Sequence, residues 1–552
     1  FERLGLAGGN WVRIWMIYWH LALEGTDANQ GYHGAGVYNL VNAWKLDELF
    51  RIADRNGINL MLCLDSFNEL RDGTGHPAWK SNPYARERGG PLATMRDFWT
   101  DREARRLYRQ KLRYLVARWG AQPNLFAWEF WNEVDGISRY ETNLVAPWHA
   151  EMGKELKPLD PYHHLVTTSG GGPRGDPAIW TLPEMDLVQA HAYNLADTAA
   201  ALSKIVGALR HYGKPVIVGE FGAEVDEGKW IEEGGDQEGV HLATALWAVP
   251  LAEAAGTPMI WYWGNYVNRF GLWKHFAAVN RFLRGVDWPG EGFRPVDNAR
   301  LSFQSPPPGG GYRALRIKPD LTEWGSRQGT VRVGVDGRLE PDHGVSQYLY
   351  GDGKPEFRSP LVIKGEFKDA ATLRVHVLIV SDRAQLVVTA DGTTVFERAL
   401  VSGKGKGEWK QERFMQEWNV YQNFFDRTYE ARIPPGTREI RIANTTGDWM
   451  TVGEFELDPG RAAARPPLDV YALAGTSRAL VYLKHADLDW MRVSAGTAII
   501  PCPPATLALP GLHAGDYRVE AANVANGDRG AATSATSDAG GVVVLAEEGT
   551  TF

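Results

Sequence analysis

The 552-residue sequence has little cysteine, no long apolar run and no excess of positive charge. Its two cysteines, Cys63 and Cys502, lie far apart and lack the spacing of a metal or redox site. No run of 18 apolar residues occurs, so we expect no membrane-spanning helix. The 59 basic and 67 acidic residues give a net charge of −8, which does not favour nucleic-acid binding. We therefore expect no metal, no cofactor, no nucleic-acid partner and no membrane.

Aromatic side chains are the conspicuous surplus of the composition. The chain has 22 Trp, 20 Tyr and 20 Phe. Such residues fill cores, but flat aromatic faces also line sugar-binding clefts, where they pack against the C–H faces of pyranose rings. The length predicts two to four domains, because a single core does not grow this large.

The first half of the chain alternates short apolar runs with amphipathic segments. A run of this kind that stops at turn residues predicts a buried strand, and strands that alternate with helices predict parallel βα units. The predicted strands are 11–16, 58–64, 125–131, 165–168, 186–190, 214–219 and 258–262.

Seven strands are one short of a (β/α)₈ barrel, also called a TIM barrel, so we expect the first strand to precede Phe1. A doubly wound sheet is the alternative, but it would carry a glycine-rich phosphate turn after its first strand. Arg13-Ile14-Trp15-Met16 offers no such turn. The barrel is therefore the favoured fold.

The second half of the chain has the pattern of all-β domains, with short alternating strands separated by turns. Pro306-Pro307-Pro308-Gly309-Gly310-Gly311 and Arg465-Pro466-Pro467 are predicted joints. We expect an α/β barrel followed by two β-sandwich domains. Their predicted bounds are 1–297 for the catalytic barrel, 298–462 for a sandwich or jelly roll, and 463–552 for a smaller sandwich.

The middle domain is either a carbohydrate-binding module or a spacer. Its aromatic side chains motivate the first option, provided that some of them are exposed. The candidates are Trp409, Trp418, Tyr421 and Trp449.

Two carboxylates occupy equivalent places in the barrel pattern. Glu133 follows the run 125–131, and Glu220 follows the run 214–219. Side chains at the C-terminal ends of barrel strands face the open side of the barrel, where barrel enzymes carry their active sites. A pair of carboxylates is what glycosidic bond cleavage requires.

The residues around these carboxylates resemble a known family. Trp131-Asn132-Glu133 and Gly219-Glu220-Phe221-Gly222 are similar to the acid/base and nucleophile motifs of the clan A glycoside hydrolases, closest to family 5. The resemblance covers residues 1–290. It implies that Asn132 binds the sugar 2-hydroxyl and that Arg13 supports the nucleophile.

Further site residues follow from the same resemblance. His191 and Tyr193 match the family's His-x-Tyr pair after strand six, and Trp261 or Trp263 matches its sugar-platform tryptophan. Asp65 departs from the pattern, because many family 5 members have His at that strand end. This departure concerns the substrate, and we count Asp65 among the expected substrate-binding residues.

The resulting prediction is a retaining β-glycoside hydrolase that acts on a poly- or oligosaccharide of the β-glucan or β-mannan type. Glu133 would be the general acid/base and Glu220 the nucleophile. One alternative is an exo-acting β-galactosidase or arabinofuranosidase, and another is an inactive carbohydrate-binding protein. From the function we expect a secreted or periplasmic protein, although no signal peptide is visible.

Overall fold

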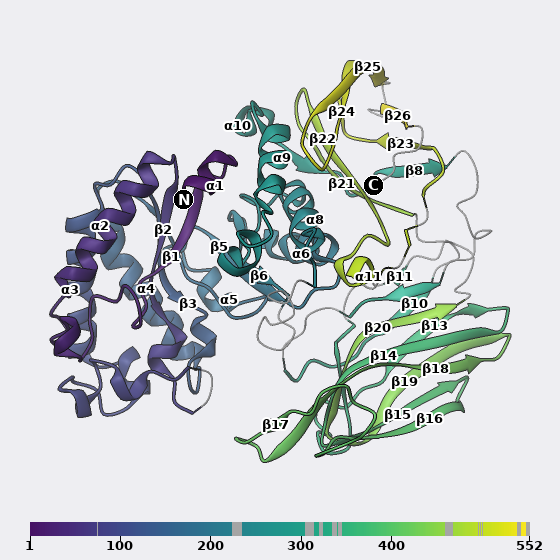
Figure 1. Ribbon diagram of the computed structural model, residues 1–552, viewed down its shortest axis with the longest axis horizontal. Coiled ribbons are helices and arrows are strands. Elements are labelled where there is room, and N and C mark those ends of the chain that lie inside the picture. Colours follow the sequence, from purple (N-terminus) through teal and green to yellow (C-terminus); the bar gives the residue numbers. More distant parts are fainter. Residues whose placement is uncertain are drawn as a thin grey trace.

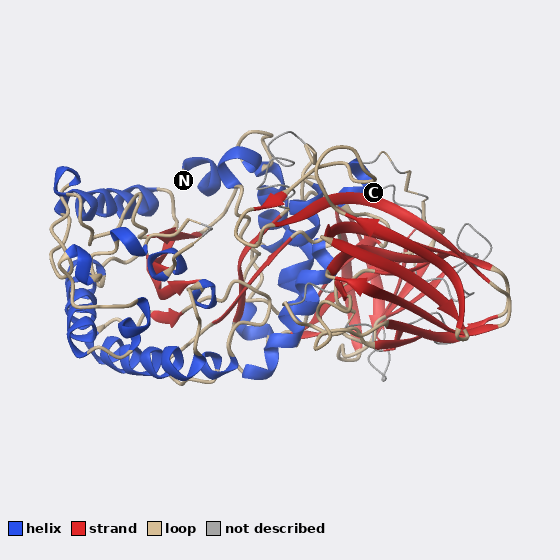
Figure 2. Ribbon diagram, turned by 90° about the horizontal axis from the view of Figure 1, so that it is seen from below, coloured by secondary structure: helices blue, strands red, loops and turns tan. Residues whose placement is uncertain are grey.

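The computed structural model of the chain combines a helix-rich α/β part with two β-rich parts (Figures 1 and 2). It describes residues 1–73, 76–223, 235–303, 314–319, 324–333, 339–340, 345–458, 467–494, 496, 498–499, 501–537 and 543–547. Among these residues, no helix combines the length and the apolar character needed to cross a membrane. The predicted joint 306–311 lies outside the described residues, and the joint 465–467 does so except for Pro467.

Parallel strands form the centre of the α/β part. Four of them pair in the order β1 (Trp11–Trp15), β2 (Asn59–Ser66), β3 (Leu125–Asn132) and β4 (Leu165–Thr167). A second parallel pair consists of β5 (Val188–Tyr193) and β6 (Val216–Gly222). Six of the seven predicted strands are thus confirmed. In the described residues the two ladders remain separate, so the sheet pairing establishes parallel βα architecture but no closed barrel.

The prediction of a seventh strand at 258–262 was wrong, because this segment forms no regular strand. Its only strand-like pairing among the described residues is an isolated parallel bridge between Phe221 and Ile260. Phe221 N–H donates to the carbonyl of Met259 at 2.9 Å, and Trp261 N–H donates to the carbonyl of Phe221 at 2.9 Å. Pro258 has no N–H to begin a ladder, and the chain enters a π-helical turn at Trp263–Val267.

Helices flank these strands, as Figure 1 shows. Their bounds are α1 (Glu2–Leu6), α2 (Leu40–Arg55), α3 (Arg102–Trp119), α4 (Thr142–Leu159), α5 (Pro177–Trp180), α6 (Thr198–Leu209), α8 (Val240–Ala248), α9 (Trp273–Leu283) and α10 (Trp288–Glu291). The sequence pattern did not predict α4, which contains Pro147 and Pro158. Its buried residues Val145, Trp148 and Met152 nevertheless recur at helical spacing and bury one face.

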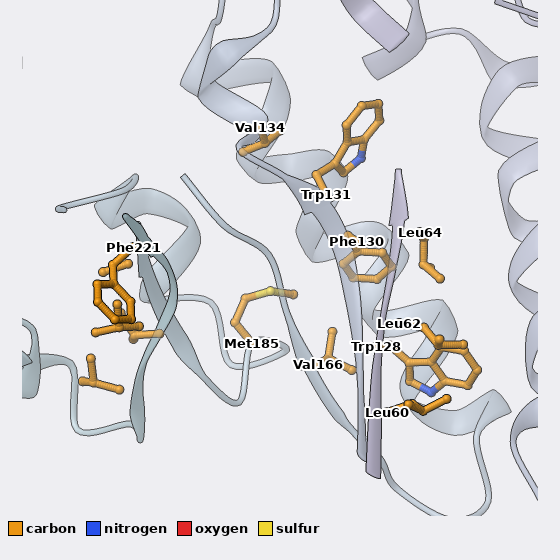
Figure 3. Close-up of a cluster of buried hydrophobic side chains, with 14 of the residues drawn as sticks. Leu60, Leu62, Leu64, Trp128, Phe130, Trp131, Val134, Val166, Met185 and Phe221 are labelled. Atoms are coloured by element: carbon orange, nitrogen blue, oxygen red, sulfur yellow. The ribbon is translucent and has the colours of Figure 1, made fainter. Parts of the chain in front are cut away.

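The main core lies between the parallel strands and their helices. Leu60 and Leu62 of β2 and Phe130 of β3 point to the same side of their strands, as Figure 3 shows. Trp148 of α4 completes this layer, with its ring centroid 5.7 Å from that of Phe130 and 4.7 Å from that of Tyr108. The ring is fully buried, so α4 is fixed against β3, the strand that Glu133 directly follows.

The middle part is built from two sheets that enclose one separate hydrophobic core. One sheet has the order β11-β10-β13-β19-β15-β16, and the other has the order β12-β20-β14-β18-β17 with β9 against β20. This is the predicted sandwich arrangement of strands. The bounds are β9 (Leu315–Ile317), β10 (Thr330–Val333), β11 (Leu339–Glu340), β12 (Tyr348–Tyr350), β13 (Leu361–Phe367), β14 (Ala371–Ser381), β15 (Arg383–Ala390), β16 (Thr393–Val401), β17 (Phe414–Met415), β18 (Val420–Ile433), β19 (Thr437–Gly447) and β20 (Trp449–Asp458).

The C-terminal part takes two strands from the chain before the sandwich. β7 (Arg294–Pro295) pairs with β21 (Leu468–Ala474), and β8 (Arg300–Phe303) pairs with β23 (Ala505–Leu509). The expected boundary at 297/298 therefore falls between two strands that both pair with the C-terminal segment. The remaining elements are β22 (Ala479–His485), α11 (Trp490–Ser494), β24 (Gly515–Ala522), β25 (Arg529–Ser537) and β26 (Val543–Glu547).

The buried position of Trp148 generates a stability prediction. Trp148→Ala should lower the free energy of unfolding by about 3–5 kcal/mol, because it removes a large side chain from a packed aromatic cluster. Trp19→Ala is the matched control, because Trp19 is 55% exposed and should cost no more than about 0.5 kcal/mol. Urea unfolding followed by far-ultraviolet circular dichroism measures both. Equal losses in the two variants would contradict the assigned packing.

Candidate active site

Arg13 of β1 lies at the centre of a buried group of polar side chains. Its Nε and Nη2 donate to the two carboxylate oxygens of Glu129 at 2.5 and 2.6 Å, which is a bidentate pair. Its Nη1 donates to Oε1 of Glu220, and its Nη2 also donates to Oδ1 of Asn132 at 2.7 Å. One guanidinium thus joins side chains of β1, β3 and β6. All four side chains are buried or nearly so.

Glu133 and Glu220 both lie beside His191, near the end of β5. His191 Nδ1–H donates to Oε1 of Glu133 at 2.9 Å and lies 3.5 Å from Oε2 of Glu220. Tyr193 Oη–H donates to Oε2 of Glu220 at 2.6 Å. The nearest ligand atoms of Glu133, His191 and Glu220 all lie within 4.8 Å of one another. The predicted pair of carboxylates is therefore brought together.

The backbone at Glu133 is held in an unusual conformation. Its φ of 48° lies in the left-handed region, which is uncommon for a residue with a side chain. The side-chain Oγ of Ser169, two residues after β4, accepts a hydrogen bond from Glu133 N–H at 2.9 Å. A Cβ added at Gly171 would approach the Glu133 carboxyl group to 3.5 Å. The strand-end loop after β4 thus fixes both the backbone and the surroundings of Glu133.

The charges in this group are set by burial and by partners. Burial raises the pKa of Glu220, and the contacts with His191, Arg13 and Tyr193 oppose that rise. Burial also lowers the pKa of His191 to about 4, so its ring is neutral at neutral pH. A neutral ring can donate from Nδ1 without adding a charge. Glu133 is the more accessible carboxylate, with 21% of its side chain exposed against 5% for Glu220.

The two candidate platform tryptophans differ in their surroundings. Trp261 follows the bridge to Phe221 and is 39% exposed, and its ring centroid lies 4.8 Å from that of Trp15. Trp15 in turn lies against the Arg13 guanidinium. Trp263 is 65% exposed and begins the π-helical turn. Trp261 is thus the one that these contacts connect to Arg13.

Asp65 lies in a different buried network. Its Oδ1 accepts from Lys111 Nζ at 2.6 Å, and its Oδ2 accepts from Tyr108 Oη at 2.7 Å. Both partners belong to α3, and Asp65 is 6% exposed. Neither oxygen contacts Glu133 or Glu220. The structure therefore does not bring Asp65 together with the other predicted site residues, because α3 holds its carboxylate.

Glu129, Gln189 and Ser169 belong to the polar group but were not predicted from the sequence. The side-chain amide Nε2 of Gln189 donates to Oε1 of Glu129 at 2.7 Å, and both side chains are fully buried. The sequence did contain one sign of this group. Glu129 lies within the apolar run Trp128-Glu129-Phe130, and a carboxylate buried in such a run requires a partner. The sequence alone did not identify that partner as Arg13.

Two carboxyl groups at this distance, in different surroundings, can divide acid and base work between them. Glu220 has a cation and a phenol donor directed at its oxygens, which favours a carboxylate. Glu133 has a neutral imidazole beside it and access to solvent, which suits a group that gives and takes a proton. The indole of Trp261, which is partly exposed, also offers a surface on which the apolar face of a sugar ring can pack.

A family comparison matches this part of the chain. Residues 4–267 match the model of cellulase (glycosyl hydrolase family 5). The match confirms the resemblance indicated by the motifs around Glu133 and Glu220. It covers both motifs and all the other predicted site residues.

Among curated relatives, mannan endo-1,4-beta-mannosidase 3 of Oryza sativa subsp. japonica is 25% identical over 270 residues, which are 41% of this chain and 55% of the relative. Mannan endo-1,4-beta-mannosidase A of Podospora anserina is 25% identical over 284 residues, which are 46% of this chain and 66% of the relative. The chain thus spans about half to two thirds of the length of these relatives. The solved structure of the endo-beta-1,4-mannanase from Thermotoga petrophila has 15% identity and a TM-score of 0.39, covering 81% of this chain and 94% of that one.

The two carboxylates around Arg13 generate a prediction about charge. Arg13→Met should destabilise the protein by about 3–5 kcal/mol, because Glu129 and Glu220 would lose their shared cation. The deficit should grow as the pH rises through the raised pKa of Glu220, where the unpaired charge appears. Urea unfolding at several pH values measures it.

Glu129→Gln provides the control for this prediction. Added to Arg13→Met, it removes one of the two stranded charges, so the double variant should be more stable than Arg13→Met alone. A double variant that is less stable by the full sum of the two single effects would show that Arg13 and Glu129 do not interact.

Proposed function

We propose that residues 4–267, as a region of glycosyl hydrolase family 5, cleave the β-1,4 bonds of a mannan with retention of the anomeric configuration. The observation that carries this proposal is the meeting of Glu133 and Glu220, whose carboxylates approach within 4.8 Å from the ends of β3 and β6. Retaining enzymes have their carboxyl groups about 5–5.5 Å apart, whereas inverting ones leave about 6.5–9.5 Å. The names of the relatives support mannan as the substrate.

In the first step, Glu220 attacks the anomeric carbon of the sugar as a carboxylate. Glu133 gives its proton to the glycosidic oxygen at the same time, so the bond between that oxygen and the anomeric carbon breaks. The products are a shortened chain with a free hydroxyl and an ester between the sugar and Glu220. Arg13 and Tyr193 keep Glu220 charged before the attack, since both donate to its oxygens.

In the second step, Glu133 has become a carboxylate and takes a proton from water. The water oxygen attacks the anomeric carbon and displaces Glu220, which leaves as the carboxylate it was at the start. His191 lies within hydrogen-bonding distance of Glu133 and next to Glu220. It therefore positions one carboxylate relative to the other through both steps.

The remaining predicted residues belong to substrate binding in this proposal. Asn132 supports the site through its hydrogen bond from Arg13 and binds the sugar 2-hydroxyl. Trp261 offers an exposed ring for a pyranose face. Asp65 and Trp263 are also proposed to bind substrate, although α3 holds the Asp65 carboxylate and Trp263 begins the π-helical turn.

The proposed architecture is a (β/α)₈ barrel to which β1–β4 and β5–β6 both belong. The family match supports closure, and so does the contact of side chains from both ladders at His191. The domain division of 1–297, 298–462 and 463–552 stands as a proposal, with β7 and β8 added to the last domain by their pairing. Action on a polysaccharide fits a secreted or periplasmic protein.

The sandwich is proposed to bind carbohydrate. Trp418 is 59% exposed, and Tyr421 pairs with Phe414, which is 46% exposed. Trp449 is 9% exposed, and Trp409 packs against the sandwich core. Trp418 is thus the candidate with most ring surface available.

The acid/base assignment predicts a selective loss. Glu133→Gln should lower kcat on mannan by about 10²–10⁴-fold, because the leaving oxygen loses its proton donor. Cleavage of a dinitrophenyl β-mannoside to the glycosyl-enzyme should be affected much less, because that leaving group needs no proton. Glu155→Gln on the exposed face of α4 is the control and should match the wild type. Full mannan turnover by Glu133→Gln would contradict the assignment.

The nucleophile assignment predicts a stereochemical result. Glu220→Ala should not turn over mannan, but azide should rescue its action on an activated β-mannoside and yield the glycosyl azide of inverted configuration. The wild type should release the β-anomer first, as seen by proton NMR. An initial α-anomer from the wild type would exclude Glu220 as the nucleophile.

The substrate assignment is tested by a polysaccharide panel. Mannan, glucomannan, cellulose and xylan are incubated with the wild-type chain, and product sizes are measured by chromatography. We expect release of manno-oligosaccharides of several lengths from the two mannans. Release of single sugars alone would favour an exo-acting enzyme instead.

A further inference from the structure

The C-terminal part of the chain contacts the segment that directly follows Tyr193. This segment, Asn194–Thr198, links β5 to α6. Its first residue has a φ of 60°, and its N–H donates to the carbonyl of Gly222 at 2.9 Å. Tyr193 therefore sits at the end of a strand whose continuation is fixed by neighbouring parts of the molecule.

Trp490 of α11 makes the most direct of these contacts. Its indole Nε1–H donates to the carbonyl oxygen of Leu195 at 2.6 Å, and both residues are about 5% exposed. Leu195 lies two positions after Tyr193. Trp490 belongs to the same hydrophobic cluster as the parallel strands, so the C-terminal part shares the core of the α/β part here.

Lys484 of β22 holds the other end of the same segment. Its Nζ is fully buried and donates to Oδ2 of Asp197 at 3.0 Å. It also donates to the carbonyls of His485 and Leu488 at 3.2 and 3.1 Å. Asp197 in turn caps α6 by accepting from Ala200 N–H at 3.1 Å. Lys484 Nζ also lies 3.4 Å from Oδ2 of Asp469 on β21, so one buried cation faces two carboxylates and ties Asp197 to the C-terminal part.

A second route from Trp490 leads to the other side of the site. The ring of Trp490 stands edge-on to that of His241, with centroids 6.3 Å apart. His241 stacks on Phe221, with centroids 5.1 Å apart and an interplanar angle of 17°. Phe221 directly follows Glu220. Tyr193 and Glu220 share a hydrogen bond. Trp490 therefore contacts the segment after Tyr193 directly and the chain next to Glu220 through His241.

We propose that Trp490 and Lys484, from the C-terminal part, are positioning residues for the active site. They hold Asn194–Thr198 so that Tyr193 Oη stays directed at Glu220 Oε2. This inference rests on the proposed function of Glu220. In this view the C-terminal part is a component of the catalytic unit, and it acts through Tyr193 without touching substrate.

The ionisation of Glu220 reports on this arrangement. The groups that face its carboxylate are Arg13 from β1, Glu133 from the end of β3, and His191 and Tyr193 from β5. Of these, only Tyr193 lies next to the segment that Trp490 holds. Its hydrogen bond lowers the pKa of Glu220. A looser Tyr193 should therefore raise that pKa, and the pH above which Glu220 is charged should rise with it.

The test is Trp490→Phe, which removes the indole N–H but keeps an aromatic ring. We expect kcat/KM on mannan to fall about 3- to 10-fold, the effect of one neutral hydrogen bond. The acid limb of the pH profile should move up by about half a pH unit. Carbon-13 NMR of protein labelled at the Glu carboxyl carbons, with the Glu220 signal assigned from Glu220→Gln, should show the same shift without any turnover.

Two variants control for a general loss of packing. Trp247→Phe removes another indole hydrogen bond of this interface, from Trp247 Nε1 to the carbonyl of Val524 at 3.2 Å, far from Tyr193 in the chain. It should leave the pH profile unchanged. Tyr193→Phe removes the phenol itself. In that background Trp490→Phe should cause no further shift, because its effect passes through Tyr193.

The outcomes separate the two proposals. An unchanged Glu220 titration in Trp490→Phe, or an equal shift in Trp247→Phe, would overturn the positioning role even if the wild type hydrolyses mannan. A wild type that hydrolyses no β-glycoside would overturn the proposed function, while the NMR titration would still decide the positioning role. If Trp490→Phe does not fold, Asp197→Asn tests the same segment, since the amide can keep the cap but not the charge opposite Lys484.

Discussion

The structure of the site depends on one buried cation placed between two buried carboxylates. Arg13 binds Glu129 with two hydrogen bonds and Glu220 with a third donor, so three strands are tied together by one planar group. Lysine could not do this, because a single ammonium group lacks the rigid fork of donors. The expense of burying these charges is offset only while all three remain in place. Neighbouring polar side chains add further hydrogen bonds to these ions. Asn132 accepts from Arg13, and Gln189 donates to Glu129.

The sequence predicted those features that depend on residues close together in the chain. Six parallel strands and the carboxylates at the ends of β3 and β6 follow from local apolar runs and from the residues at which they stop. Helix α4 was not predicted, and its two prolines are atypical of a helix interior, although its buried residues recur at helical spacing. The place of Asp65 could not be predicted, since Lys111 and Tyr108 reach it from a helix that follows a long loop. Glu129 was missed for the same reason, because its partner Arg13 is more than a hundred residues away.

The domain boundaries show a similar limit of local patterns. Proline-rich segments predicted joints between the parts, but they could not predict which strands pair across those joints. β7 and β8 pair with β21 and β23, and Trp490 packs in the main core. The C-terminal part therefore completes its sheets with strands that precede the sandwich, and it shares buried surface with the α/β part. The sandwich, in contrast, encloses a core of its own.

This connectivity has a consequence for the order of folding. Phe303 of β8 pairs with Ala505 of β23, although the entire sandwich lies between them in the sequence. During synthesis from the N-terminus, β7 and β8 emerge long before their partner strands exist, so their edges stay open while the sandwich folds by itself. Non-local pairing of this kind is slow to form, because a long loop must close first. β22 and α11, which support the segment after Tyr193, thus leave the ribosome only after the sandwich, and a chain released before them would carry an open sheet edge that favours aggregation.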